Sequence, residues 1–374
     1  INATITKAIK ARASDIHLEP FENKLNIRFR VDGVLREVLQ YQKNITQMII
    51  SRIKIMSKLD ISERRLPQDG RISISVGKRD IDLRVSTLPS SFGERVVLRI
   101  LEKDKTQINL DQLGFNQSIL ESFRKNLSKT EGIILVTGPT GSGKTTSLYS
   151  GLREISDRSQ NILTIEDPVE YALEGIGQTQ VNNKTGLTFA KGLRAVLRQD
   201  PDIVMVGEIR DKETAEIAIQ ASLTGHLVLS TVHTNSAVNA ITRLRDMGIE
   251  PYLLSSSLIY VLSQRLVRRL CEKCKVLDEE INKTNLLEKH QLDGEVYKAN
   301  GCTECDKTGF KGRLSIGEFV SIDDQVSELI HNSASENEIS DYVYKDNNKI
   351  FENGLIALAN GDTSMSELMR VTED

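Results

Sequence analysis

The part of the sequence with the clearest chemical potential is the segment GPTGSGKT at positions 138–145. It fits the phosphate-loop pattern and lies between an apolar, strand-like run at 133–137 and a stretch compatible with a helix. Glycines let the backbone N–H groups of such a loop turn toward an anion, and the N-terminus of the following helix points at the same anion. Lys144 would place a positive charge beside the β- and γ-phosphates, and the Thr145 hydroxyl would bind Mg²⁺. The predicted ATP-binding residues are Gly138, Pro139, Thr140, Gly141, Ser142, Gly143, Lys144, Thr145 and Thr146.

Hydrolysis of a nucleotide also requires carboxylates, and two acidic residues follow apolar runs that suit strands. Glu166 ends the run that begins at Ile162, and Glu208 follows the run 203–206 after one glycine. Ligands of open parallel sheets bind at the carboxyl ends of the strands, so both acids should face the nucleotide. We expect Glu208 to hold Mg²⁺ through water and Glu166 to orient and deprotonate the attacking water, with an exchange of the two roles left open. The alternative for either acid is a helix cap.

A third strand-like run, 227–232, has a histidine at each end. His233 lies beyond the carboxyl end of the run, on the side predicted for the nucleotide, where it would sense the γ-phosphate. His226 precedes the run and is a weaker candidate. The alternative for both is a packed or hydrogen-bonded histidine without a catalytic role.

Arginines are further cations that phosphoryl transfer uses, because negative charge builds up on the transferred group. Arg194 and Arg198 are four residues apart on a predicted amphipathic helix and therefore share one face. Arg210 follows the acid Glu208, and Arg243 follows the second histidine. Residue type and position alone do not distinguish these four side chains from ordinary surface arginines.

All four cysteines occur in two C-x₂-C pairs, Cys271 with Cys274 and Cys302 with Cys305. Pairs with this spacing present four thiolates to a tetrahedral Zn²⁺ ion, whereas disulfides are disfavoured in the cytoplasm. Because four protein ligands leave no open coordination position, the predicted zinc is structural. The long interval between the pairs predicts a looped-out zinc-binding subdomain over 271–312. Redox-active dithiols and free buried cysteines are the alternatives.

The first 102 residues have the pattern of a small α+β domain. Apolar and polar residues alternate on both sides of Asp32-Gly33, which is a strong hairpin signal, and a second hairpin is predicted to turn at Gly77-Lys78. The run 95–101 adds a further strand, and 45–59 has helical spacing. We therefore predict an N-terminal α+β domain over 1–102.

The remainder of the chain changes its pattern twice. Residues 103–131 are polar and suit a linker, and over 132–250 short apolar strands alternate with helices, as in a parallel sheet. Residues 251–374 are expected to be mainly helical. The predicted fold class is α/β: a RecA-like phosphate-loop NTPase core, a smaller N-terminal α+β (PAS-like) domain, and a C-terminal helical region that carries the zinc subdomain.

Composition restricts the class of protein further. The 374 residues are 39% hydrophobic and 27% charged, which is typical of a globular protein. Neither a signal peptide nor an apolar run of the roughly 18 residues that span a bilayer occurs, so we expect a cytoplasmic protein that reaches a membrane only through partners. Residues 1–102 contain 19 Lys and Arg against 12 Asp and Glu, but the two signs are interleaved, so no nucleic-acid partner is predicted. Because the chain begins at Ile1 rather than methionine, an N-terminal part is expected to precede it.

Together these motifs closely resemble those of the type II secretion and type IV pilus assembly ATPases. The resemblance covers nearly the whole chain, and its last segment is similar to the secretion branch. The segments that carry it are ASDIHLEP, RLPQDGRI, VSTLPSSFGERVVLRIL, GPTGSGKTTSLY, TIEDPVEY, LRAVLRQDPDIVMVGEIRD, TGHLVLSTVHTNSA, QRLVRRLCEKC, GCTECDKTGFKGR and LMRVTED.

The resemblance implies a homohexameric ATPase in the bacterial cytoplasm, peripheral to the inner membrane, which powers pseudopilus assembly and protein export by a type II secretion system. Its implied partners are recruiting proteins and an integral membrane platform protein. The resemblance also implies that the 1–102 module closes over the nucleotide, that Glu208 is catalytic and that the four cysteines bind zinc. The arginines implied in nucleotide contacts or hydrolysis are Arg84, Arg99, Arg194, Arg198, Arg210 and Arg243.

Three other functions remain open from the sequence. Within the same class, the chain would be a type IV pilus or competence-pilus assembly ATPase. A nucleic-acid translocase or helicase on a RecA-like core belongs to a second class, and a scaffold that binds nucleotide without hydrolysing it belongs to a third. The intact set of Lys144, Glu166 and Glu208 disfavours the scaffold.

Overall fold

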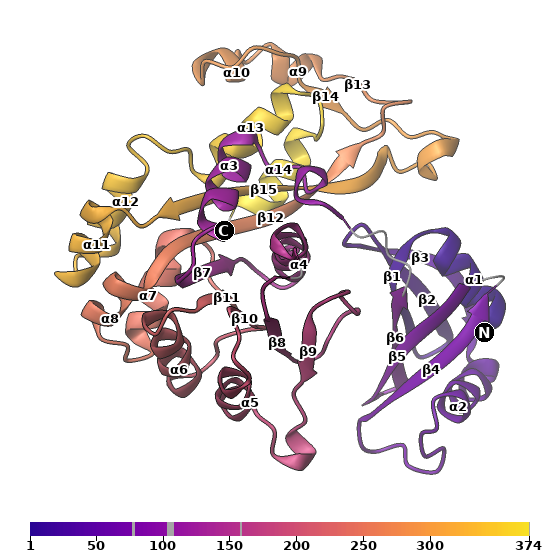
Figure 1. Cartoon of the computed structure of the whole chain (residues 1–374). Helices are drawn as coiled ribbons and strands as arrows, with labels where there is room; N and C mark the ends of the chain where they lie inside the picture. Colours follow the sequence, from indigo (N-terminus) through magenta and orange to yellow (C-terminus); the bar gives the residue numbers. More distant parts are fainter. Residues whose placement is uncertain (77–78, 103–107, 158, 374) are drawn as a thin grey trace. The chain divides into compact units, whose positions relative to one another are not determined.

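The structure is a computed structural model that describes residues 1–76, 79–102, 108–157 and 159–373 (Figure 1). It divides into two compact units, Ile1–Thr106 and Gln107–Asp374, each with its own sheet and hydrophobic core. The turn predicted at Gly77-Lys78 lies outside the described residues. The predicted α/β fold class, with a sheet that is mostly parallel in the larger unit, is confirmed.

The N-terminal unit is an antiparallel sheet with the strand order β3-β2-β1-β6-β5-β4 and two helices that share its core. The hairpin predicted at Asp32-Gly33 joins β2 to β3, and both turn residues have positive φ, as a two-residue hairpin loop requires. The described elements of this unit are α1 (Asn2–Lys10), β1 (Ala13–Pro20), β2 (Lys24–Val31), β3 (Val34–Gln42), η1 (Lys43–Ile45), α2 (Thr46–Met56), β4 (Gln68–Val76), β5 (Arg79–Ser90) and β6 (Gly93–Glu102).

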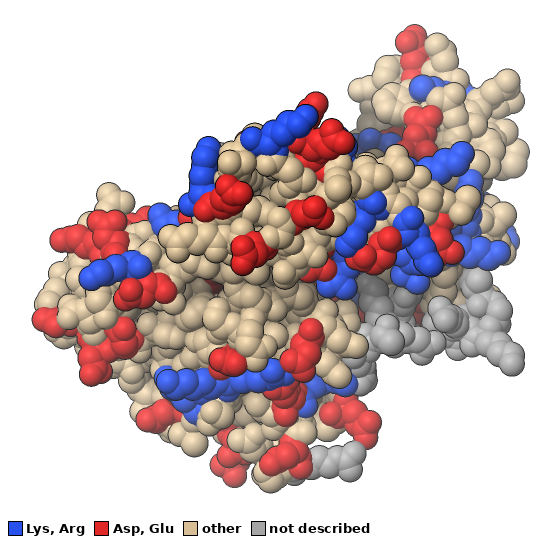
Figure 2. Space-filling model, turned by 90° about the horizontal axis from the view of Figure 1, so that it is seen from above, with Lys and Arg blue, Asp and Glu red and all other residues tan. Residues whose placement is uncertain are grey.

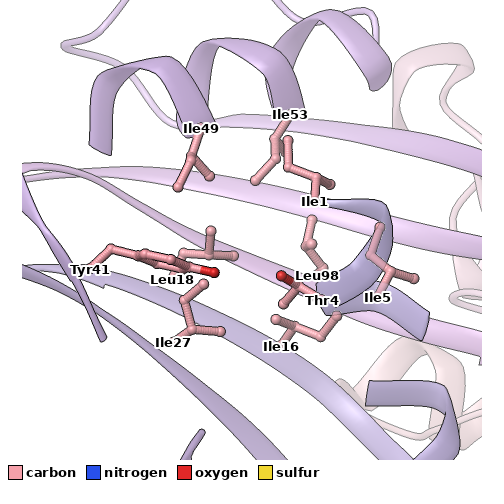
Figure 3. A pocket seen from close by; sticks show the side chains of 10 residues that line it. All are labelled: Ile1, Thr4, Ile5, Ile16, Leu18, Ile27, Tyr41, Ile49, Ile53 and Leu98. Carbon is pink, nitrogen blue, oxygen red and sulfur yellow. The ribbon is translucent and has the colours of Figure 1, made fainter. Parts of the chain in front are cut away.

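The core of the N-terminal unit contains a small cavity between the two helices and the sheet (Figure 3). Its volume is about 50 Å³, and its lining is mostly aliphatic. The lining residues are Ile1, Thr4, Ile5, Ile16, Leu18, Ile27, Tyr41, Ile49, Ile53 and Leu98. A space with so few polar groups is a packing feature of the core and offers no catalytic chemistry.

The larger unit is built on a seven-stranded sheet with the order β15-β12-β7-β11-β10-β8-β9, in which only β15 and β12 pair antiparallel. Its strands and 3₁₀ turns up to residue 270 are η2 (Leu110–Gln112), β7 (Gly132–Thr137), β8 (Ile162–Glu166), β9 (Gly177–Gln180), η3 (Asn183–Thr185), η4 (Leu197–Gln199), β10 (Ile203–Val206), β11 (Leu227–Val232) and β12 (Leu258–Leu270). The helices over the same range are α3 (Gln117–Leu127), α4 (Lys144–Ile155), α5 (Phe189–Val196), α6 (Lys212–Leu223), α7 (Ala237–Asp246) and α8 (Pro251–Ser257).

After residue 270 the chain forms a small excursion and then completes the sheet. The elements of this part are β13 (Val276–Leu277), α9 (Glu279–Asn282), α10 (Leu286–Lys289), β14 (Tyr297–Lys298), η5 (Thr303–Cys305), β15 (Phe310–Ser321), α11 (Asp324–His331), α12 (Glu336–Val343), α13 (Ile350–Ala359) and α14 (Met365–Thr372). Besides a core group that joins β12 and β15 to α13 and α14, two separate groups of core residues cover the two faces of the sheet. One includes α3 and α4, and the other includes α5 to α8 with α11 and α12 (Figure 1).

Two regions differ from the sequence prediction. The range 103–131, expected to be a linker, contains α3, whose side chains Ile119, Leu120 and Phe123 are buried in the core of the larger unit. The region after 250, expected to be mainly helical, also supplies the long strands β12 and β15 to the central sheet. The physical reason is that short apolar runs suit a buried strand or a buried helix equally, and pairing with distant β7 decides between them.

Candidate active site and metal centre

The glycine-rich loop connects the buried strand β7 to helix α4, as the phosphate-loop pattern predicts. A Cβ on Gly138, whose φ is +142°, would lie 2.4 Å from the carbonyl oxygen of Gln264, so only glycine fits there. Gly143, with φ +91°, is the left-handed residue directly before α4. Ser142 Oγ is buried and lacks a hydrogen-bond partner among the described residues. The loop therefore has both the close backbone approach and an unused polar group that suit a bound phosphate.

Lys144 begins α4, and its side chain is turned back onto the loop. Its ammonium group donates to the carbonyl oxygens of Gly138 at 2.8 Å and Pro139 at 3.1 Å. Burial lowers the pKa of Lys144 to about 8, with the charge of Glu208 opposing the shift and that of Arg265 adding to it. A phosphate at this position would relieve the burial cost, because it would supply negative charge beside the ammonium group.

Glu208, His233 and Arg210 form a cluster of polar side chains at the carboxyl edge of the parallel strands. Glu208 follows β10, and its Oε2 lies 3.6 Å from Nε2 of His233, which follows the neighbouring strand β11. Arg210 donates to the other carboxylate oxygen of Glu208. Burial lowers the pKa of His233, as does the charge of Lys144, whereas the carboxylate of Glu208 opposes the shift. The structure thus brings Lys144, Glu208, Arg210 and His233 together.

Glu166 ends β8 as predicted, but its carboxylate is directed into the protein. It is 2% exposed and accepts hydrogen bonds from Tyr149 of α4, from Thr164 Oγ1 at 2.5 Å and from Gln178 Nε2 at 3.1 Å. Burial raises the pKa of Glu166, although these hydrogen bonds oppose the shift. Its oxygens are therefore occupied by a structural network, which was not foreseen from the sequence.

The other predicted histidine and arginines of the larger unit are more dispersed. His226 lies at the opposite end of β11 from His233, where Nδ1 is 2.9 Å from the carbonyl oxygen of Ala221. Arg194 of α5 pairs with Glu213 at 2.7 Å, which leaves both side chains largely exposed. The two remaining arginines lie on separate elements, Arg198 in η4 and Arg243 in α7.

Two further predicted arginines, Arg84 and Arg99, belong to the N-terminal unit. They are direct cross-strand neighbours on β5 and β6, which places their side chains on one face of that sheet. Arg99 Nε donates to Asp15 of β1 at 2.9 Å. Burial would raise the pKa of Asp15, but the hydrogen bonds from Arg99 and Ser14 lower it.

The structure adds a residue that the sequence analysis missed. Gln264 of β12 is fully buried, and its side chain bonds to both the phosphate loop and α4. Its partner Ser142 is 122 residues away in the sequence, so no local motif relates the two. The signal in the sequence is a short polar stretch, Ser263 to Arg265, within the apolar run that became β12.

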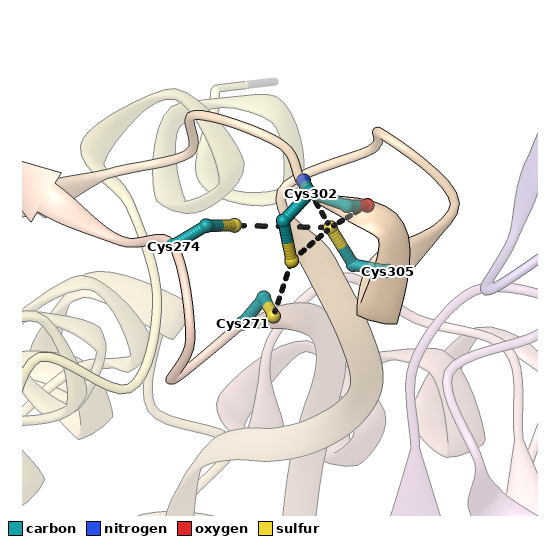
Figure 4. A group of neighbouring side chains, drawn as sticks. All are labelled: Cys271, Cys274, Cys302 and Cys305. Carbon is teal, nitrogen blue, oxygen red and sulfur yellow. Dashed lines mark hydrogen bonds between the residues drawn. The ribbon is translucent and has the colours of Figure 1, made fainter.

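The four cysteines converge at the ends of β12 and β15, at the base of the small excursion (Figure 4). The sulfur atoms of Cys271 and Cys302, of Cys274 and Cys305, and of Cys302 and Cys305 are each 3.8 Å apart, and all four lie within 4.8 Å of one another. Sulfur atoms at about 2.3 Å from a tetrahedral zinc are about 3.8 Å apart, so the spacing fits a bound metal, whereas a disulfide requires about 2.05 Å.

Backbone N–H groups complete the surroundings of this cysteine cluster. Gly301 donates to the sulfur of Cys274 at 3.3 Å, and Cys302 and Gly309 donate to the sulfur of Cys305 at 3.2 and 3.1 Å. Such bonds stabilise thiolates and fix their directions toward a cation. The cluster could therefore hold a metal ion with all four protein ligands in place.

Two further observations concern the surface and the helices. Over the face shown in Figure 2, lysines and arginines are interspersed with aspartates and glutamates, unlike the basic stripe that marks many nucleic-acid-binding proteins. Among the described residues, no helix is both long enough and apolar enough to cross a bilayer.

Comparison with known proteins decides the family. The type II/IV secretion system protein family matches residues 1–370. The type II secretion system ATPase E of Vibrio cholerae is 54% identical over 376 residues, which cover all of this chain and 75% of the relative. The type II secretion system protein E of Pseudomonas aeruginosa is 56% identical with the same coverage. The chain belongs to the type II/IV secretion system protein family.

Solved structures agree with this assignment. The pilus retraction motor PilT with bound ADP has a TM-score of 0.66 at 25% identity, over 100% of this chain and 97% of PilT. The ATPase DotB of Legionella pneumophila has a TM-score of 0.72 at 21% identity, over 99% of this chain and 94% of DotB, which shows a shared fold. With the family match and the secretion ATPase relatives, this identifies the chain as a secretion ATPase.

Proposed function

We propose that this secretion ATPase is the motor subunit of a type II secretion system, which hydrolyses ATP at the loop 138–146 to power pseudopilus assembly and protein export. The observation that carries the proposal is the meeting of Lys144, Glu208 and His233 at the carboxyl edge of the parallel strands, beside a loop with the geometry of a phosphate cradle. The identity of more than half of the residues with secretion-system relatives supports this branch over the pilus branch.

We assign the catalytic carboxylate to Glu208 and a supporting role to Glu166. Glu208 and Lys144 interact electrostatically, and the Glu208 side chain is 14% exposed, which gives it access to a bound nucleotide and its water. Glu166 is more deeply buried, with its carboxylate held by three side chains. Mg²⁺ would bind through the Thr145 hydroxyl and, by way of water, Glu208, and it would neutralise charge on the β- and γ-phosphates. Glu208, rather than Glu166, would therefore activate the attacking water, an exchange that the sequence analysis left open.

His233 and the arginines would stabilise the charge that develops during phosphoryl transfer. His233 is the histidine at the nucleotide edge, and Arg210 is the arginine that already contacts Glu208. We propose further contributions from the five arginines that stand apart in the larger unit or belong to the N-terminal unit. These are Arg84, Arg99, Arg194 and Arg198, together with Arg243 of α7.

The four-cysteine cluster would hold a structural Zn²⁺. Its support is the sulfur spacing, which matches tetrahedral thiolate coordination, together with the three N–H groups directed at the sulfurs. Thiolates favour zinc over hard cations such as Mg²⁺. We further propose that the active form is a homohexamer at the cytoplasmic face of the bacterial inner membrane, where recruiting and platform proteins of the secretion apparatus would be its partners.

The proposal is tested by phosphate release from ATP and Mg²⁺, measured over a range of protein concentrations for the parent protein and for Lys144→Ala. The parent should hydrolyse ATP with a specific activity that rises with concentration, because ring assembly would be required. Lys144→Ala should retain its circular dichroism spectrum and lose at least 100-fold in activity. Near-parental hydrolysis by that variant would refute the assignment of the site.

Two further experiments distinguish the proposed function from a nucleic-acid translocase and from a pilus assembly ATPase. Single-stranded DNA or RNA should not stimulate hydrolysis, and stimulation would favour a nucleic-acid translocase. In the bacterium, deletion of the gene should abolish protein export through the type II system while pilus assembly continues. Loss of pili with normal export would instead assign the chain to the pilus branch.

A further inference from the structure

Gln264 joins three parts of the larger unit through a buried amide. Its Nε2 donates to the carbonyl oxygen of Ser142 at 2.7 Å, and its Oε1 accepts from the hydroxyl of Ser147 at 2.8 Å. Ser142 lies within the glycine-rich loop, and Ser147 lies in the first turn of α4. Both polar ends of one side chain are therefore satisfied, one by the loop and the other by the helix that follows it.

The strand register explains why Gln264 reaches the loop. In the parallel pair β12–β7, Ser263 stands opposite Thr137, the last residue of β7. Gln264 is the next residue along and so lies beside the start of the loop. Its carbonyl oxygen would be 2.4 Å from a Cβ on Gly138, and its Nε2 would be 3.1 Å from a Cβ on Gly143. One residue of β12 therefore occupies the space beside both Gly138 and Gly143 of the loop.

The contact to Ser142 has a consequence for the neighbouring amide. In a planar trans peptide, the C=O of Ser142 and the N–H of Gly143 point in opposite directions. Because Gln264 holds this C=O toward β12, the N–H of Gly143 is directed away from β12, to the side of the loop that Gln264 does not fill. In phosphate loops such N–H groups cradle the α- and β-phosphates.

We propose that Gln264 is a positioning residue for nucleotide binding, which sets the orientation of the Ser142–Gly143 peptide and fixes the loop to α4. The inference rests on the proposal that the loop 138–146 binds ATP. Gln264 touches no phosphate in this role, because its amide lies behind the loop and acts through the backbone. Since the α- and β-phosphates occur in both ADP and ATP, Gln264 contributes equally to the binding of either nucleotide.

The test compares three variants with the parent by titration with fluorescent ATP and ADP. Gln264→Met keeps the length of the side chain and removes both hydrogen bonds. Ser147→Ala removes only the bond to Oε1. Val261→Ala is the matched control, because Val261 is fully buried three residues earlier on β12 and pairs with Leu135 in the middle of β7, away from the loop.

Gln264→Met should raise the Kd of both nucleotides by about ten-fold or more, since a buried carbonyl would lose its partner. Ser147→Ala should raise it by a smaller factor, and Val261→Ala should leave it within about two-fold of the parent while it lowers the melting temperature. The inference is overturned by a parental Kd in Gln264→Met, or by equal losses of affinity in Gln264→Met and Val261→Ala. If the parent binds neither nucleotide, the proposed function of the loop fails instead.

If Gln264→Met does not fold, a second variant tests the positioning role of Gln264. Gln264→Glu keeps the size and the acceptor for Ser147, but its ionised carboxylate would face the carbonyl oxygen of Ser142, whereas its protonated form would donate to it. The ratio of its Kd to that of the parent should therefore fall as the pH is lowered from about 7.5 toward the ordinary glutamate pKa of about 4.3. A ratio that does not change with pH would contradict the role of the Ser142 contact.

Discussion

Oε2 of Glu208 and Nε2 of His233 lie 3.6 Å apart, although the two residues follow different strands. The parallel pairing of β10 with β11 creates this proximity, because it aligns their carboxyl ends at one edge of the sheet. Burial lowers the pKa of His233, and so does the charge of Lys144, so the imidazole is neutral near pH 7. A neutral histidine at this position can donate a hydrogen bond to a bound phosphate, and it leaves the negative charge of Glu208 in place.

The lowered pKa of Lys144 predicts how nucleotide affinity depends on pH. Below a pKa of about 8 the ammonium form predominates and attracts phosphate, and above it the amine loses this charge. The affinity of the free protein for ADP should therefore weaken as the pH rises through about 8, which a titration series between pH 7 and 9.5 would show. Lys144→Arg keeps its charge in this range and should remove the dependence. A parent affinity that stays constant across the series would contradict the burial of this ammonium group.

The network around Glu166 predicts a structural effect without a large catalytic one. Tyr149→Phe removes one donor to the buried carboxylate and should lower the free energy of unfolding by about 1–2 kcal/mol, measured by urea denaturation. Tyr171→Phe is a suitable control, because Tyr171 stacks edge-on against Tyr149 and its ring would be retained. A Tyr149→Phe protein as stable as the parent would show that the contact with Glu166 contributes nothing.

The cysteine cluster predicts a metal-dependent stability. The parent should contain about one zinc per chain, and Cys302→Ser should lose most of it, because one of the four ligands is replaced by a poorer one. The melting temperature should fall by several degrees, and chelation of the parent should reproduce this fall. Thr303→Ser, in the same turn, serves as the control. Full metal content in Cys302→Ser would argue against four-cysteine coordination.

Glu367 predicts a second pH dependence, this time of stability. Burial would raise the pKa of Glu367, but hydrogen bonds from Arg268 and Arg370 lower it to about 2 from its usual 4.5. The ionised form thus stabilises the fold above about pH 4.5, and this contribution is lost as the pH falls toward 2. Glu367→Gln should cost about 3 kcal/mol at pH 7, because it leaves Arg268 without its charged partner. The difference from the parent should shrink below pH 4.5, and a constant difference would contradict the assignment.

Local motifs explain what could be predicted from the sequence. The loop around Lys144 and the two cysteine pairs depend on spacing within short segments, and the structure places each set together. The alternation of strands and helices after 132 likewise predicted the parallel sheet and the edge where Glu208 and His233 lie. The catalytic roles of these residues remain predictions.

Long-range packing explains what could not be predicted. The side chain of Glu166 turns inward because Tyr149 and Gln178 lie beneath it, and neither contact follows from the pattern of β8. The strand β12 pairs with β7, more than 100 residues earlier, and only this pairing places Gln264 against the phosphate loop. Helix α3 has apolar residues at helical spacing, Ile119, Leu120, Phe123 and Leu127, but it lies within a largely polar range that was interpreted as a linker.

The most direct test of the account compares Glu208→Gln with Glu166→Gln in the oligomeric protein. For each variant, the rate of phosphate release is measured at saturating ATP and Mg²⁺, and the nucleotide Kd is measured separately. The account predicts that Glu208→Gln binds ATP within about three-fold of the parent and hydrolyses it at least 100-fold more slowly, because the carboxylate beside Lys144 is gone. It predicts that Glu166→Gln keeps more than a tenth of the parental rate. Parental hydrolysis by Glu208→Gln, or loss of hydrolysis in Glu166→Gln alone, would contradict it.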